Sequence, residues 1–284
     1  MIDLITGKTK SGKTTLIKEK IKTMQNPVVI LDFKNDFDDI QTKTINLGLI
    51  DPFLSPMDYN DAIAINSGLV EYSQFLAERS QEVLKDFCLE EDWKEYKMKN
   101  LIDEALKRAT NGWNQHENAK AKESRRFLNF KKSKQELILE DEIQKIEHDD
   151  IVVVKTEGLH SIQTRVLSFL LLKRLQQKFP SITVVSDNIN YLWRDGHLFS
   201  FSKIFDFEKN NLLLSFNKTE NFPKRLKEHI RNVFIFRLEN NSDVEFFKQL
   251  NVPIDSKTKR FRQGKYVEHN LIESTVDVVE TQPA

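Results

Sequence analysis

Cysteine and glycine are scarce in this chain of 284 residues. The single cysteine, Cys88, excludes an internal disulfide bond and fits a reducing compartment such as the cytoplasm. Only 8 residues are glycine, well below the usual share of ~7%. A motif that needs glycines at fixed spacing is therefore seldom produced by chance in this composition.

Long apolar runs and net charge are also absent. No apolar stretch approaches the roughly 18 residues of a membrane-spanning helix, and Asp3 and Lys8 interrupt the apolar run at the start. We therefore expect neither a membrane span nor a signal peptide, and a cytoplasmic location. Basic and acidic residues both number 43, so no overall field attracts a polyanion, and nucleic-acid binding depends on a local patch.

The first fourteen residues carry the most specific pattern in the chain. The apolar run Ile2–Ile5 is followed by Gly7-x-x-x-x-Gly12-Lys13-Thr14, and a helical pattern comes next. This is the phosphate-binding P-loop pattern, in the strand–loop–helix context that it requires.

The chemistry of this loop predicts ATP and Mg²⁺ as cofactors. Its glycines let backbone N–H groups approach phosphate oxygens, Lys13 reaches the β- and γ-phosphates, and the Thr14 hydroxyl holds Mg²⁺. Lys10 stands where many such loops carry another glycine. The residues predicted to bind the nucleotide are Gly7, Lys8, Thr9, Lys10, Ser11, Gly12, Lys13, Thr14 and Thr15.

Apolar runs of strand length recur along the chain, separated by helical patterns. They cover residues 28–31, 151–154, 182–185, 212–214 and 233–236. Buried strands that alternate with helices predict an α/β fold, a mostly parallel sheet with helices on both faces. We assign residues 1–58 and 151–270 to this core and the polar residues 271–284 to a flexible tail.

Residues 59–150 differ from the core, because they have few β-branched runs and carry amphipathic helical patterns. We expect a helical insertion or lid here. Its charge changes sign, from basic residues between 120 and 134 to acidic residues between 136 and 150. Either the basic half tracks a phosphate backbone, or the two halves form a solvated hairpin and neutralise each other.

Hydrolysis also needs a carboxylate at the end of a neighbouring strand. The run of residues 181–186 is followed by Asp187, which fits a Walker B aspartate that holds Mg²⁺ together with Thr14. The next residue is Asn188, where many such ATPases carry a glutamate that polarises water. Because an amide orients water but cannot accept its proton, an ATPase with slow hydrolysis is one expectation.

The identity of the base therefore stays open at this point. In an alternative register, Ser186 lies on the metal side and Asp187 is the base. A further alternative is a carboxylate elsewhere in the chain, with Asp32, Asp36 and Glu157 as candidates.

Three further segments resemble the FtsK–HerA superfamily of DNA-pumping ATPases. Residues 28–37, VVILDFKNDF, are similar to its second strand and the following Asp-x-Lys-Gly-Glu-Tyr/Phe, with Asn35 and Asp36 in place of Gly and Glu. Residues 151–178 are similar to the strand and helix before its Walker B motif. Residues 211–238 resemble its sensor strand, a helix and a strand that ends in Arg, with Asn217 in place of the usual Gln.

The resemblance implies a RecA-like P-loop NTPase and a homo-oligomeric ring, usually a hexamer, with ATP sites between subunits. It implies a motor that moves double-stranded DNA in viral genome packaging, conjugative transfer or related DNA pumping, with a portal, capsid or transfer complex as a further partner. The candidates for an arginine finger that reaches the neighbour's ATP are, in order of preference, Arg237, Arg231 and Arg225. The predicted catalytic residues are Lys13, Asp187, Asn188, Asn217 and Arg237.

Two other functions remain as alternatives. The first is a nucleotide-dependent switch with slow hydrolysis and no translocation, which Asn188 and the neutral net charge favour. Lys8 also occupies the position of the signature lysine of partitioning-type ATPases, although Thr9 and Lys10 replace the glycines of that signature. The second is a small-molecule kinase, which needs an arginine-lined pocket that the sequence does not identify.

Overall fold

The computed structural model describes residues 1–24, 27–40, 42–51, 137–159, 161–187, 205–219, 222, 224–238, 240–254 and 256–280. Most of the expected helical insertion, residues 59–136, lies outside this part of the chain, and so does Asn188.

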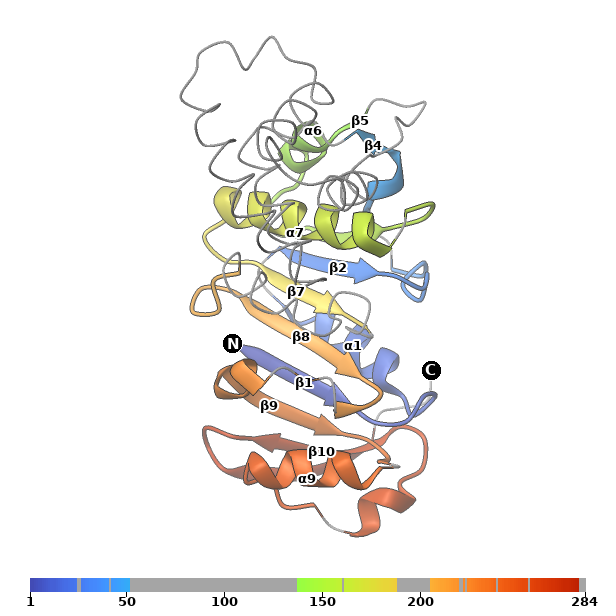
Figure 1. The fold of residues 1–284 in the computed structure, drawn as a ribbon, viewed down its shortest axis with the longest axis vertical. Coiled ribbons are helices and arrows are strands. Elements are labelled where there is room, and N and C mark those ends of the chain that lie inside the picture. Colours follow the sequence, from blue (N-terminus) through green and yellow to red (C-terminus); the bar gives the residue numbers. More distant parts are fainter. Residues whose placement is uncertain are drawn as a thin grey trace, which may run out of the picture.

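Within the described residues, nine strands form one sheet in the order β11-β10-β9-β1-β8-β7-β2-β6-β3. The strands from β9 to β3 in this order are parallel, and β10 and β11 are each antiparallel to their neighbour. The carboxyl ends of the parallel strands therefore meet along one edge (Figure 1). The parallel strands are β1 (Ile2–Thr6), β2 (Val28–Asp32), β3 (Lys43–Asn46), β6 (Ile151–Lys155), β7 (Thr183–Ser186), β8 (Asn211–Phe216) and β9 (Ile230–Ile235).

The central strands are apolar because both faces of the sheet are covered. In β2, Val29 and Leu31 belong to one buried cluster, while Val28 and Ile30 belong to the cluster on the other face. This division follows from the alternation of side chains along a strand. The continuous apolar runs of the sequence therefore mark strands buried on both faces, as predicted.

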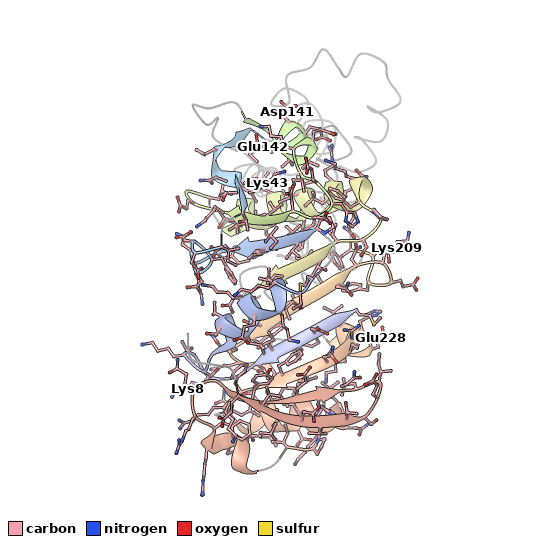
Figure 2. The ribbon with its side chains drawn as sticks, turned by 180° about the vertical axis from the view of Figure 1, so that it is seen from behind. Lys8, Lys43, Asp141, Glu142, Lys209 and Glu228 are labelled. Carbon is pink, nitrogen blue, oxygen red and sulfur yellow. The ribbon has the colours of Figure 1, made fainter. Side chains whose placement is uncertain are left out.

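Helices cover the two faces. Helices α7 (Ser161–Lys178) and α9 (Asn241–Gln249) contribute to one buried cluster, and α1 (Lys13–Ile21) contributes to the other. Figure 1 shows α7 and α9 in front of the sheet, and Figure 2, seen from behind, shows α1 in front of it. None of the helices in the described ranges has the length and apolar character to cross a bilayer.

Smaller elements complete the described part of the chain. Strands β4 (Ile50–Asp51) and β5 (Leu137–Ile138) pair in parallel, and β5 leads into α6 (Leu139–Gln144). Short 3₁₀ helices cover Leu47–Leu49, Lys224–His229 and Ser256–Arg260.

The C-terminal part of the chain forms a hairpin of β10 (Lys265–Asn270) and β11 (Thr275–Glu280). We expected a flexible tail from residue 271, and the structure instead has a strand over six of these residues. Pairing is through the backbone, and Val276 and Val278 are 45% and 63% exposed. Val279 is partly buried against the cluster that contains α1, so β11 adds little to the core.

Truncation of a buried side chain of α7 tests the packing on this face. Phe169 is 0% exposed and belongs to the cluster under α7, so Phe169→Ala should lower the free energy of unfolding by about 3–5 kcal/mol. Gln177→Ala, at an exposed position of the same helix, should change it by less than about 0.5 kcal/mol. Urea unfolding followed by circular dichroism measures both, and equal midpoints would contradict the packing.

Candidate nucleotide-binding site

The predicted phosphate-binding loop connects β1 to α1 at the carboxyl edge of the sheet. Gly7 has φ +145° and Gly12 has φ +106°, in the region that favours glycine. Lys10 also has a positive φ of 63°, where non-glycine residues are uncommon. Figure 2 shows Lys8 at this edge, with Lys209 and Glu228 at the opposite one.

Phe236 explains why both glycines are needed. A Cβ atom on Gly7 would lie 2.6 Å from the Cβ of Phe236, and a Cβ on Gly12 would lie 3.3 Å from its ring. Phe236 follows β9 and is 0% exposed. The loop therefore rests directly on a core side chain, and any larger residue at Gly7 would displace one of them.

Two strand ends hold the backbone at the start of the loop. The Gly7 N–H donates to the carbonyl of Phe216, at the end of β8, over 3.3 Å. The Lys8 N–H donates to the carbonyl of Arg237, just after β9, over 2.8 Å. The conformation of the loop is thus set by the strands on both sides of β1.

Lys13, the first residue of α1, lies inside the loop. Its side chain donates to the carbonyls of Gly7 at 2.7 Å and Lys8 at 2.9 Å, and the residue is 7% exposed. Burial lowers the Lys13 pKa to about 8, while the nearby Asp187 carboxylate opposes this shift. An anion in the loop would favour the charged amine, as expected for a phosphate-binding lysine.

The structure brings Thr14 and Asp187 together across β8, the strand between β1 and β7. The Thr14 hydroxyl donates to Oδ2 of Asp187 over 2.6 Å, and Asp187 is 9% exposed. Ser215 of β8 donates to Oδ1 of the same carboxylate. Sequence reasoning missed Ser215, although a buried serine inside the apolar run of β8 is a signal that could have identified it.

The donor set at this point fits Mg²⁺. A threonine hydroxyl and an aspartate carboxylate are hard oxygen ligands, and Mg²⁺ is usually held by one or two such groups while substrate phosphates and water complete its shell. No cluster of three or more His, Cys, Asp or Glu residues suited to a metal occurs in the described ranges. The predicted ligands Thr14 and Asp187 thus match a metal that binds together with a nucleotide.

Ser186 does not share the surroundings of Asp187. In β7, Val184 belongs to the cluster on the α7 face and Val185 to the cluster on the α1 face. Alternation therefore puts the buried Ser186 on the α7 face, away from Thr14. The register in which Ser186 lies on the metal side disagrees with this arrangement.

Asp32, at the end of β2, accepts hydrogen bonds from the backbone of the turn that follows it. Its carboxylate accepts the backbone N–H groups of Lys34 at 3.3 Å, Asp36 at 3.0 Å and Phe37 at 3.3 Å, and the residue is 2% exposed. Both oxygens are therefore used to shape the backbone. The turn is further anchored by Phe37, which is 1% exposed in the cluster that contains α1.

The other two candidate carboxylates differ in their neighbours. Partial desolvation raises the pKa of Asp36, and the charge of Asp187 raises it further. Glu157 is exposed and accepts a hydrogen bond from the Asn35 side chain over 3.2 Å. Asp36 is exposed as well, and its carboxylate is not one of the groups that close the turn.

The remaining predicted residues have different positions. Asn217 follows Phe216 at the carboxyl end of β8 and is half-buried. Arg237 is exposed beside its own phosphate-binding loop. Arg231 lies at the start of β9, 3.9 Å from Asp3, and thus at the opposite edge of the sheet. Asn188 and the side chain of Arg225 lie outside the described part of the structure.

No protein-family model matches the sequence, and no curated protein sequence matches it significantly. Solved structures do match. The bacterial conjugative coupling protein TrwB aligns over 99% of this chain and 84% of its own, with a TM-score of 0.66 and 12% identity. TrwB in complex with the GTP analogue GDPNP aligns over 99% and 85%, with a TM-score of 0.63 and 12% identity.

The genome packaging NTPase B204 from Sulfolobus turreted icosahedral virus 2, in complex with AMPPCP, is a further match. It aligns over 100% of this chain and 98% of its own, with a TM-score of 0.52 and 10% identity. At such identities the likeness concerns the fold. The chain therefore has the RecA-like P-loop NTPase fold that the sequence and its resemblance to the FtsK–HerA superfamily predicted.

Proposed function

We propose that this protein is an ATPase that moves double-stranded DNA, as in viral genome packaging, conjugative transfer or related DNA pumping. The observation that carries the proposal is the 2.6 Å bond between Thr14 and Asp187, beside a buried Lys13. The matched structures of a genome packaging NTPase and a conjugative coupling protein support the DNA-moving part. No observation in the described residues favours a switch without translocation or a kinase.

The mechanism assigns one task to each element of the site. The loop N–H groups and Lys13 would bind and orient the triphosphate, and Thr14 and Asp187 would hold Mg²⁺. Bound Mg²⁺ would neutralise charge on the phosphates. Asn217 contacts the γ-phosphate or the attacking water through its amide. In a homo-hexameric ring, the exposed Arg237 serves as the finger toward a neighbouring ATP, and a portal, capsid or transfer complex binds the ring.

Asp36 is our proposal for the general base. Asp32 is occupied by three backbone N–H groups, and Glu157 is paired with Asn35. The charge of Asp187 acts on Asp36, and the raised pKa of Asp36 makes it a better proton acceptor than an ordinary aspartate. With a carboxylate in this position, Asn188 need only orient water, and hydrolysis does not have to be slow.

Removal of the Lys13 amine tests the nucleotide site and the motor together. We expect double-stranded DNA to stimulate ATP hydrolysis by the wild type, and Lys13→Ala to lower kcat by roughly 10²-fold or more with and without DNA. Lys22→Ala removes an exposed amine just after α1, outside the loop, and should keep its activity. Phosphate release at low salt measures hydrolysis by the wild type and both variants. Wild-type hydrolysis that is not stimulated by DNA would contradict the motor.

Neutralising Asp187 tests the metal site. Asp187→Asn keeps the shape of the side chain but removes its charge, so roughly 10–100-fold more Mg²⁺ should be needed for half-maximal hydrolysis. The side chain of Asp149 is 96% exposed, so Asp149→Asn should leave the Mg²⁺ titration unchanged. An unaltered titration for Asp187→Asn would remove this residue from the metal site.

The proposed base can be separated from nucleotide binding. Asp36→Asn should lower kcat by roughly 10²–10⁴-fold while the Kd for Mg·ATP changes little. Asp39→Asn removes an exposed carboxylate of the same turn, which is paired with Lys18 at 2.6 Å, and should retain kcat. Single-turnover kinetics and calorimetry give the two quantities, and a fully active Asp36→Asn would leave the base elsewhere.

A further inference from the structure

The turn before β10 touches the phosphate-binding loop directly. The backbone N–H of Gly264 donates to the carbonyl of Ser11 over 2.9 Å. The N and Cα atoms of Gly264 lie 3.2 Å from the position that a Cβ on Gly12 would take. Two glycine backbones are therefore packed against each other, and the C-terminal hairpin begins at the wall of the candidate ATP site.

This contact acts on a peptide unit that belongs to the phosphate cradle. The Ser11 carbonyl and the Gly12 N–H are parts of the same peptide plane, and in a trans peptide they point in opposite directions. The described residues contain no cis peptide bond. A donor that holds the Ser11 carbonyl on the outside of the loop therefore turns the Gly12 N–H toward the inside, where phosphate oxygens bind.

Gly264 has the backbone conformation that this contact requires. Its φ is +83°, and the residue is buried. The next residue begins β10, which pairs with β9 through Val267 and Ile235. The hairpin also reaches the loop through Tyr266, whose ring centroid lies 5.0 Å from that of Phe236, the side chain beneath both loop glycines.

We propose that Gly264 is a positioning residue of the ATP site, and that the β10–β11 hairpin responds to nucleotide binding through it. The inference rests on the proposed function, because it assumes that the loop binds a triphosphate. Gly264 acts through the Gly12 amide and does not contact the nucleotide itself. By thermodynamic linkage, a ligand that requires this amide orientation stabilises the Gly264 hydrogen bond, and that bond in turn favours the ligand.

Two matched glycine variants test the positioning role. Gly264→Ala introduces a Cβ at φ +83°, which strains the turn whose N–H donates to Ser11, and should weaken Mg·AMPPCP binding roughly fivefold, the worth of one hydrogen bond. Gly158→Ala carries the same kind of backbone strain at φ +76°, with nothing within 4 Å of the new Cβ. It should bind as the wild type does, although both variants should lose similar amounts of Tm.

Hydrogen exchange of the wild type gives a second measurement that needs no variant. Mg·AMPPCP should slow exchange in the peptide that covers residues 262–270 and leave β3, at the far edge of the sheet, unchanged. The positioning role is overturned if Gly264→Ala binds as tightly as the wild type, or, should that variant not fold, if residues 262–270 show no slowing. A wild type that binds no nucleotide would instead refute the proposed function itself.

Discussion

The alignment of three parallel strands, β1, β8 and β7, is the constraint on which the candidate site depends. The register pairs Ser186 with Leu214, so that Asp187 comes level with Ser215, which donates a hydrogen bond to it. A slip of one residue in β7 would turn Asp187 toward the face covered by α7 and away from Thr14. The apolar residues that fix this register therefore also fix the position of the carboxylate, and hydrophobic packing and metal-site geometry have the same cause.

Glycine is scarce in the chain, and three of the eight glycines meet at the candidate phosphate-binding loop. Gly7 and Gly12 lie on Phe236, and Gly264 lies against Gly12. A loop supported in this way keeps its N–H groups oriented before a ligand binds, so that binding carries no entropy cost for ordering them. The buried ring of Phe236, which packs against Tyr266, would thus support phosphate binding although it offers no polar atom.

The sequence predicted those parts of the molecule that have a local signal. Apolar runs such as Val28–Leu31 gave the central strands, and the spacing of Gly7, Gly12 and Lys13 gave the loop. Other parts depend on neighbours that are remote in sequence: Gly264 meets Ser11 only because β10 pairs with β9. Strand β11 was not predicted, because its place in the sheet depends on backbone pairing with β10.

The two candidate aspartates Asp32 and Asp36 show that the type of a residue does not by itself decide its role. In the sequence, one lies at the end of a strand and the other in the turn that follows it. The fold separates them, because the Asp32 carboxylate accepts the N–H groups of Lys34, Asp36 and Phe37. These bonds close the turn, and Phe37 anchors it in the core. Asp36 lies between these two anchors of the turn, so in the proposed mechanism the first aspartate supports the second.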